Sequence, residues 1–385
     1  MRYGRMRRVL GLGGAVLVLG VLSGPAAQAA PAGTVVAWGD NADGQLGNGT
    51  FTAHSTAQAV RGLTGVKQLR GGREHVIALR TNGTVWAWGH NNYGQVGDGT
   101  TTNRNVPVQV SGLTDVKQIS TGHYHSMALK TNGTVWSWGW NHFGQLGDGT
   151  TANRHVPVRV ENLTGVIQIA GARDHALALK SDGTVWAWGD DEFGNLGNGS
   201  DGQSNVPVRV NGLTNIVAIA GGRDHSLAVK RNGSVWAWGW NHYGQLGDGT
   251  TTNRSTPVRV NLPTTLTIVK VSAGADHSVA LSGAGHVWAW GQNSFGQVGD
   301  GTGVERRTPV RLDSIANIVQ IGTGRLHTLA VGAGGGVWAW GDNDFGQLGD
   351  GSHTDRHAPV KVANVTTGEQ VAGGRDYSVA LVGTS

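Results

Sequence analysis

Histidines recur at nearly constant spacing along the 385-residue chain and are the first candidates for chemistry. Each ends a Gly-rich turn, and the series comprises His75, His125, His175, His225, His277 and His327, with Tyr377 at the seventh position. Imidazoles can bind metals or transfer protons. However, a residue present in nearly every repeat serves the repeat, whereas a catalytic site is one asymmetric set of groups. We therefore expect a structural ring, with each imidazole buried and hydrogen-bonded to backbone groups of its turn.

The same turns carry arginines, usually followed by an acidic residue as in Arg73-Glu74. The arginines are Arg73, Arg173, Arg223, Arg325 and Arg375. Two turns keep only half of the pair, so Arg325 and Asp276 lack a neighbouring partner. Arginine is enriched at the centre of protein interfaces, so we count these five residues as candidate binding residues.

Long Gly-rich loops follow each Trp-Gly pair and hold the most variable positions. The candidate binding residues there are His90, Asn92, Tyr93, Trp140, His142, Phe143, Trp240, His242 and Tyr243. Trp140 and Trp240 stand where other repeats have Asp, His or Gln, so the strand pattern does not require them. This predicts a protein-binding surface, although each indole could equally fold back over its own loop. The recurrent Phe or Tyr, as at Tyr93, is expected to plug the loop.

Several chemistries are excluded by composition. The chain has no Cys, which removes disulfides, thiolate metal sites and thiol nucleophiles. The Asp-rich loops lack the regular spacing and terminal Glu of a calcium loop, and the Gly-x-Gly runs end hairpins instead of opening helices. Without the four arginines of the first eight residues, the net charge falls from +5 to +1. We therefore expect no metal, cofactor or nucleic-acid ligand.

A repeat of about 50 residues positions all these side chains. GTVWAWGHNNYGQVGDGT at Gly83 returns in similar form at Gly133, Gly183 and Gly233. Further copies begin at residues 33, 285 and 335, so seven repeats occupy residues 30–385. Each contains four short segments of alternating polarity, for example VIQIA, HALAL, VWAWG and PVRV within residues 166–210. Asn-Gly pairs between the second and third segments predict type I′ hairpin turns.

Four-stranded units repeated in this way predict an all-β, seven-bladed β-propeller of antiparallel blades. The chain starts on the third strand of a unit, near Gly33, and ends on a second strand, Tyr377 to Leu381. We therefore expect strands from both termini to share one blade and close the ring. An open solenoid is the alternative, but it would expose strand edges at both ends. In each blade, the turn between the first and second strands holds the arginine, and the long loop joins the third and fourth strands. These two connections should lie on the same face, because strands alternate in direction.

The repeated motif, a Trp-Gly pair followed by x-N-x-[FY]-G-Q-L-G-D-G, then Pro-Val and a turn ending in His, resembles the regulator of chromosome condensation repeat family. The resemblance covers residues 33–381 and implies a seven-bladed propeller. Members of this family include a nuclear guanine-nucleotide exchange factor, a plant ultraviolet-B photoreceptor and secreted bacterial inhibitors of β-lactamases. The family resemblance therefore implies protein binding through propeller faces.

The first 29 residues are typical of a secretory signal peptide, with Arg2, Arg5, Arg7 and Arg8 before an apolar run and Ala27-Gln28-Ala29 as a cleavage site. A retained membrane anchor is the alternative. We interpret the chain as a secreted, monomeric, non-enzymatic propeller, with no membrane association after cleavage, that binds an extracellular or cell-envelope protein through its long-loop face. Other hypotheses are inhibition of a secreted or periplasmic hydrolase such as a β-lactamase, exchange-factor-like activity, and an enzyme that uses the axial His ring.

Overall fold

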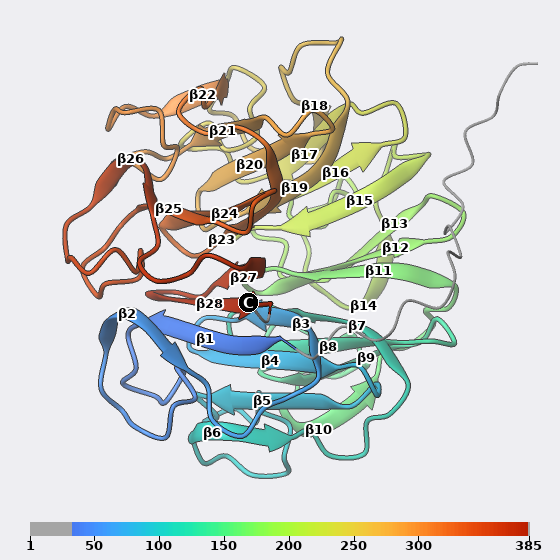
Figure 1. Cartoon of the computed structure of the whole chain (residues 1–385). Coiled ribbons are helices and arrows are strands. Elements are labelled where there is room, and N and C mark those ends of the chain that lie inside the picture. The colour runs from blue at the N-terminus through green and yellow to red at the C-terminus, as the bar shows by residue number, and fades with distance from the viewer. Residues whose placement is uncertain (1–32, 384–385) are drawn as a thin grey trace, which may run out of the picture. The chain divides into compact units, whose positions relative to one another are not determined.

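A computed structural model describes residues 33–383 (Figure 1). Within them, 28 strands form seven four-stranded antiparallel sheets, and these sheets are the blades of the predicted propeller. No helix in this part of the chain is long and apolar enough to cross a membrane. The predicted signal peptide, residues 1–29, lies outside the described residues.

Six blades follow the order of the chain. Blade 1 contains β3 (Val66–Gly71), β4 (His75–Arg80), β5 (Val85–Gly89) and β6 (Arg104–Gln109). Blade 2 contains β7 (Val116–Thr121), β8 (His125–Lys130), β9 (Val135–Gly139) and β10 (Arg154–Arg159). Blade 3 contains β11 (Val166–Gly171), β12 (His175–Lys180), β13 (Val185–Gly189) and β14 (Ser204–Arg209).

The other three of these blades have the same organisation. Blade 4 contains β15 (Ile216–Gly221), β16 (His225–Lys230), β17 (Val235–Gly239) and β18 (Arg254–Arg259). Blade 5 contains β19 (Ile268–Ala273), β20 (His277–Ser282), β21 (Val287–Gly291) and β22 (Arg306–Arg311). Blade 6 contains β23 (Ile318–Thr323), β24 (His327–Gly332), β25 (Val337–Gly341) and β26 (Arg356–Lys361).

Blade 7 joins the two ends of the described chain. It consists of β27 (Gly368–Gly373), β28 (Tyr377–Val382), β1 (Thr34–Gly39) and β2 (His54–Ala59), in the sheet order β2-β1-β28-β27. β1 and β28 are antiparallel, in register from Thr34 opposite Val382 to Gly39 opposite Tyr377. The predicted closure is therefore confirmed, and the open solenoid is wrong.

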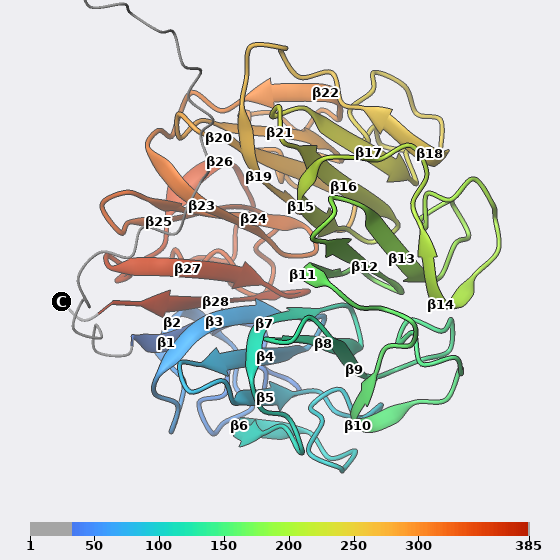
Figure 2. The ribbon, with the colours of Figure 1, turned by 90° about the vertical axis from the view of Figure 1, so that its right-hand side faces the viewer.

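The first strand of each blade lies nearest the axis, and the fourth lies outermost (Figure 2). Each innermost strand contacts the innermost strands of the neighbouring blades, as β3 does with β7 and β27. Most of the side chains of the second and third strands are buried, as in β4 and β5. The axis is consequently surrounded by seven strands of similar sequence.

The second Trp of each Trp-x-Trp pair fills the space between two blades. Trp138 of blade 2 is fully buried among Leu79, Val96 and other residues of blade 1. Its indole N–H donates to the carbonyl of Gln95 at 2.9 Å. Gly97, at φ +77°, lets the loop pass the indole, because a Cβ there would lie 2.6 Å from the indole nitrogen. At about 25 cal/mol per Å² of buried apolar surface, these aromatic joints contribute strongly to interblade packing.

The Asn-Gly hairpins differ from the sequence prediction. Only the glycine, for example Gly83 at φ +81°, has positive φ, whereas a type I′ turn would require it at both central residues. The amide of Gly83 donates to the carbonyl of Arg80, and the amide of Arg80 donates to the carbonyl of Thr84. This is a three-residue connection that ends in a left-handed glycine. Asn82 contributes its side-chain oxygen, which accepts the amide of Thr84 at 3.1 Å, so it needs no strained backbone.

Candidate binding face

The His ring lies inside the propeller. All six imidazoles are fully buried, and burial lowers their pKa, to about 3 for His75 and His175, so they are neutral at pH 7. Nε2 of His75 lies 2.9 Å from the hydroxyl of Ser126 in the next blade. Equivalent bonds join His175, His225, His277 and His327 to Ser226, Ser278, Thr328 and Ser378. The expected bond to backbone groups of the residue's own turn is therefore wrong. Nε2 bonds a side chain of the neighbouring blade, and Nδ1 of these histidines has no hydrogen-bond partner among the described residues.

Two positions depart from this pattern. Tyr377 replaces the seventh His, and its hydroxyl donates to the carbonyl oxygens of Gly72 and His75, at 3.1 and 2.6 Å. It thereby joins blade 7 to blade 1. His125 faces the position of Ala176, which has no hydroxyl, and its Nε2 has no hydrogen-bond partner among the described residues.

The arginines of the turns lie around one end of the axis, and with the acidic residues they form two runs of ion pairs, which together we call the arginine ring. Arg173 pairs with Asp174 of its own blade and, at 3.2 Å, with Asp224 of the next. Arg223 pairs in the same way with Asp224 at 3.0 Å and Asp276 at 3.3 Å. Asp276 therefore has the partner that its own turn does not supply. A second, separate run of ion pairs joins Arg375 to Glu74 at 3.1 Å and Arg73 to Glu74 at 3.4 Å.

Burial has a clear effect on the acidic members of the ring. It raises the pKa of Asp174 and of Asp276 to about 6, although nearby arginines oppose the shift. Burial also lowers the pKa of His123, which occupies an arginine position, and Arg73, Arg173 and Arg325 lower it further. At pH 7 the ring thus combines arginine cations, carboxylates and one neutral imidazole.

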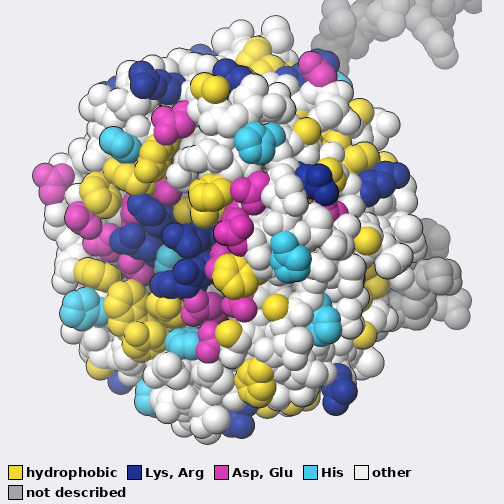
Figure 3. Space-filling model, turned by 90° about the vertical axis from the view of Figure 1, so that its left-hand side faces the viewer, with side chains coloured by type: hydrophobic (Ala, Val, Ile, Leu, Met, Phe, Trp, Pro, Cys, Tyr) yellow, Lys and Arg dark blue, Asp and Glu magenta, His cyan; other side chains and the backbone are white. Residues whose placement is uncertain are grey.

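A pocket of about 310 Å³ lies beside this ring. Its described lining consists of Arg73, His123, Tyr124, Trp140, Arg173, Asp174, Arg223 and Arg325. Arg325 makes no ion pair with any residue in the range 33–383, since Leu326 occupies the acidic position of its turn. On this face Lys and Arg side chains gather in one cluster bordered by acidic and hydrophobic side chains (Figure 3). The pocket therefore offers a cation next to aromatic surface.

Aromatic side chains from the long loops of blades 1 and 2 and from the β7–β8 turn of blade 2 form a continuous group, which we call cluster A. Its members are His90, Tyr93, Tyr124, Trp140, His142 and Phe143. Tyr124 lies at its centre, 5.1 Å from Tyr93 and 6.2 Å from Trp140 between ring centroids. His142 stacks on Trp140 at 6.1 Å with an interplanar angle of 8°. The guanidinium of Arg73 lies 5.1 Å from the Tyr124 ring, which links cluster A to the axial ring.

A second group, cluster B, lies two blades further round. It contains Phe193, Trp240, His242 and Tyr243, and His242 stacks on Trp240 at 6.0 Å. The guanidinium of Arg223 lies 4.5 Å from the Trp240 ring. Both tryptophans are thus held between an arginine or aromatic neighbour on the axial side and a histidine of their own loop.

The structure brings most of the predicted binding residues together, at different depths. Asn92, His142 and His242 are exposed, while Trp140 and Trp240 are half-buried. His90 is only 8% exposed, and its Nδ1 lies 2.6 Å from the Gln95 side chain, so it supports cluster A from beneath.

Two details of the loops were not foreseen. The recurrent Phe or Tyr does not plug its loop, since Tyr93 is half-buried and Phe345 is 44% exposed. The loop is instead held by a fully buried Asn such as Asn141, which accepts the amide of Leu146 and donates to the carbonyls of Thr150 and Ala152. Tyr124, at the centre of cluster A, was not among the predicted binding residues. It stands where other turns have an acidic residue such as Glu74 or Asp174, and this departure from the repeat was the signal for its role.

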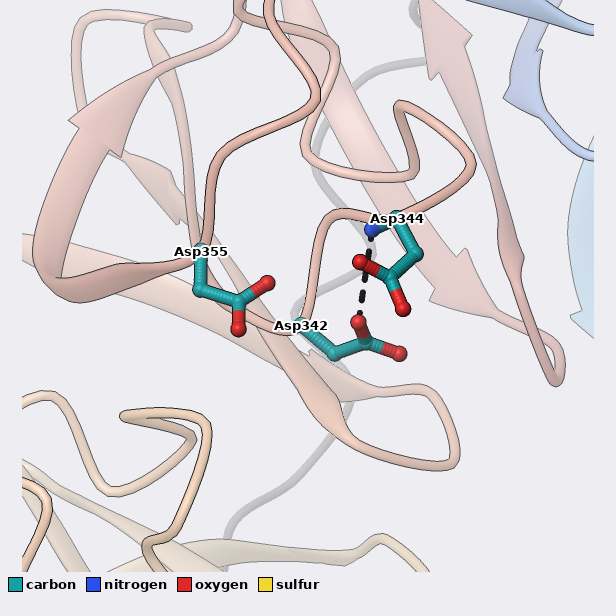
Figure 4. Close-up of side chains that lie close together, drawn as sticks. All are labelled: Asp342, Asp344 and Asp355. Atoms are coloured by element: carbon teal, nitrogen blue, oxygen red, sulfur yellow. Dashed lines mark hydrogen bonds between the residues drawn. The ribbon is translucent and has the colours of Figure 1, made fainter.

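Three aspartates also come together in the loop of blade 6. Asp342, Asp344 and Asp355 have carboxylate oxygens within 4.8 Å of one another (Figure 4). Asp342 accepts the amide of Asp344 and the side-chain amide of Gln347, and Asp355 accepts the amide of Asn343. Asn residues make this last bond in other blades, as Asn103 does with Asn91. These carboxylates therefore fasten the loop, and we assign them no ligand.

Closed four-stranded blades with one face of long loops define a β-propeller whose variable surface lies around one end of the axis. The chain belongs to the RCC1-like domain family, whose profile matches residues 21–267 and 166–385. This confirms the resemblance seen in the repeats. A search of curated proteins found no significant match.

Solved structures with the same fold include Prp20p from Saccharomyces cerevisiae, with 24% identity, 93% of each chain covered and a TM-score of 0.84. A complex of Kap60 with yeast RCC1 (Prp20) gives 23% identity, 97% coverage of each chain and the same score. Human WBSCR16 gives 25% identity over 91% of this chain and 99% of the other, with a TM-score of 0.83.

Proposed function

We propose that the protein is a non-enzymatic binding module that recognises a partner protein through its long-loop face. The observation that carries the proposal is the position of Trp140 and Trp240, each half-buried and held beside the arginine ring. Rigid aromatic groups next to arginine are typical of residues that dominate binding energy in interfaces. Because both indoles are already packed, a partner would bind them with little loss of side-chain entropy.

The chemistry of the pocket suggests what part of the partner it accepts. Arg325 supplies a cation that has no paired carboxylate in the described part of the chain, while Tyr124 and Trp140 supply flat apolar walls. A carboxylate side chain flanked by apolar residues would meet both requirements, with a charge-assisted hydrogen bond to the guanidinium. We therefore propose that the partner inserts an Asp or Glu side chain into this pocket.

Similar proteins support binding as the general role. The yeast Prp20p structure was described with its binding properties to Gsp1p and histones, and yeast RCC1 was solved bound to Kap60. We place the partner outside the cell or in its envelope, because the first 29 residues have the pattern of an export signal. A secreted or periplasmic hydrolase inhibited by the propeller is one form that this partner could take.

The test is capture of a partner by the immobilised propeller, residues 31–385, from secreted and cell-envelope proteins. The comparison variant carries Trp140→Ala and Trp240→Ala. The matched control carries Phe51→Ala and Phe345→Ala, which remove exposed aromatic rings from long loops outside clusters A and B. Circular dichroism and thermal unfolding verify that all three proteins fold.

A protein retained by the wild type and the control, and at least tenfold more weakly by the Trp variant, would support the proposed face. Arg325→Gln should then weaken the same complex, because it removes the unpaired cation. Equal retention by all variants would refute the face, and turnover of a substrate by the purified propeller would refute the non-enzymatic role.

A further inference from the structure

The innermost strands are fastened to one another by a ring of glutamines. The side-chain oxygen of Gln68 accepts the amide of Ile119 in the next blade at 3.0 Å, and Gln118 accepts the amide of Ile169 at 3.0 Å. Gln168, Gln320 and Gln370 make the same bond to Ile219, Val371 and Leu69. Five of the seven equivalent positions hold Gln, so this residue is the structural solution for the inner wall.

The other two positions break this pattern in neighbouring blades. Ala218 and Lys270 stand where Gln would serve the amides of Val271 and Ile321. A second break lies two residues further along an inner strand, where Arg70 occupies a position that holds Ser, Ala or Gly in the six other blades. These departures place two cations, Arg70 and Lys270, on the inner wall. They also leave the backbone amides of Val271 and Ile321 without a glutamine partner.

Both cations line one cavity on the axis, with a volume of about 220 Å³. The rest of its described lining includes Gln118, Gln168, Gln320, Ser272 and Thr323, and it contains no Asp or Glu. A single water needs only about 10–15 Å³ on this measure, so the space is large enough for a hydrated ion or a small molecule.

The two cations are in an unfavourable setting when the cavity holds no counter-ion. Burial and the charge of Arg70 lower the pKa of Lys270 to about 8. Burial also lowers the pKa of Arg70 to about 10. The guanidinium of Arg70 donates to the carbonyl of Leu69 at 2.8 Å, but neither cation forms an ion pair with a carboxylate among the described residues. A cation withdrawn from water is normally paired with an opposite charge. An anion between them would relieve both effects.

We propose that the axial cavity binds a small oxyanion, a phosphate or carboxylate group, between Arg70 and Lys270. The guanidinium and the ammonium supply charge-assisted hydrogen bonds. The amides of Val271 and Ile321, left without a glutamine, belong to residues that line the same cavity. The site lies inside the ring of blades and involves none of the residues of the long-loop face.

The face opposite the long loops provides an entrance. A pocket of about 570 Å³ there shares Gln118, Lys270 and Gln320 with the axial cavity, so the two adjoin at these side chains. Among residues 33–383, its lining includes Lys67 and Lys117 against a single acidic residue, Glu369. The positive charge of this mouth would attract an anion towards the cavity.

The experiment measures binding of inorganic phosphate to residues 31–385 at pH 7 by calorimetry and thermal unfolding, against chloride at equal ionic strength. Acetate forms a second arm, because it tests whether a carboxylate suffices. The variants Lys270→Gln and Arg70→Ser introduce residues that other blades already hold at these positions, so both should fold. Arg209→Gln, on the exposed side of β14, removes one positive charge elsewhere and is the matched control.

We expect phosphate or acetate to bind the wild type and the Arg209 variant with one site, and each inner-wall variant at least tenfold more weakly. Lys270→Gln should also unfold at a higher temperature than the wild type without anion, since the introduced glutamine would accept the amide of Ile321. Absence of binding by both anions, or equal affinity in Lys270→Gln and wild type, would overturn the proposal. Neither result bears on the long-loop face.

Discussion

The orphaned imidazole of His125 offers a direct test of how the blades are joined. His125 and Ala176 are both fully buried. Ala176 occupies the position that is equivalent to Ser226 in the next blade, and the hydroxyl of Ser226 is hydrogen-bonded to His175. Ala176→Ser should give His125 the partner that it lacks. The new hydroxyl would also reach the carbonyl of Gln145, because Ser126 donates to the equivalent Gln95 carbonyl at 2.9 Å.

The magnitude follows from the cost of a buried polar group. An unpaired buried donor or acceptor costs about 1–3 kcal/mol, and a satisfied hydrogen bond contributes about 0.5–1.5 kcal/mol net. We expect Ala176→Ser to stabilise the propeller by about 1 kcal/mol. The reverse change, Ser126→Ala, removes the partner of His75 and should destabilise it by about 1–3 kcal/mol.

The assay is thermal unfolding by calorimetry, together with urea unfolding. A domain of this size has an unfolding entropy of about 0.7 kcal/mol/K, so 1 kcal/mol corresponds to about 1–2 °C. The nitrogen resonances of His125 should shift towards those of His175 in the Ala176→Ser protein. Destabilisation by Ala176→Ser, or no effect of Ser126→Ala, would refute the argument that the hydroxyl completes the joint.

Three further predictions concern other departures from the repeat. Asp191 replaces the Asn that holds the loop in other blades, and burial raises the pKa of Asp191 to about 7. Asp191→Asn should therefore stabilise the propeller at pH 8 by about 1–3 kcal/mol, and Asn141→Asp should destabilise it by a similar amount. Thermal unfolding measures both effects. The pKa of Asp276 is about 6 in the folded state and about 3.8 in the unfolded state, so its ionisation opposes folding as the pH rises from 4 to 6. The free energy of unfolding of Asp276→Asn should therefore increase by about 2–3 kcal/mol relative to that of the wild type between pH 4 and pH 8. A difference in stability that does not change with pH would contradict this. Tyr377→His should destabilise the propeller, and adding Val76→Ser to this variant should restore stability, because the new hydroxyl would pair with the introduced imidazole. A double-mutant cycle should give a coupling energy of about 0.5–3 kcal/mol. Additive effects of the two changes would disprove the pairing.

The fold was predictable because its unit is repeated seven times. Trp88 and its equivalents mark the joints, Gly83 and its equivalents mark the hairpins, and the offset between Gly33 and Tyr377 marks the closure. Each signal is local in sequence or recurs at a fixed interval. The antiparallel register of β1 and β28 follows from the same offset.

Contacts between blades were harder to predict, because their two residues lie about 50 positions apart. The bond from His75 to Ser126 spans 51 residues, and the periodic sequence supports a partner within the turn equally well. The partner of Asp276 was missed for the same reason, since Arg223 belongs to the preceding blade. Such pairs become visible only when the angle between successive blades is known.

Repetition also gives departures from it a physical meaning. At the long-loop end of the axis, Arg173 and Arg223 each pair with one carboxylate of their own blade and one of the next blade, so their ion pairs join neighbouring blades. On the inner wall, Lys270 replaces the glutamine that fastens most other blades, Arg70 stands where the other blades have Ser, Ala or Gly, and no carboxylate is among the described residues that line their cavity. A cation that is paired in the structure can be explained by stability alone. A cation that lacks a carboxylate partner in a cavity shielded from solvent costs stability, and an anionic ligand is the simplest agent that would offset that cost.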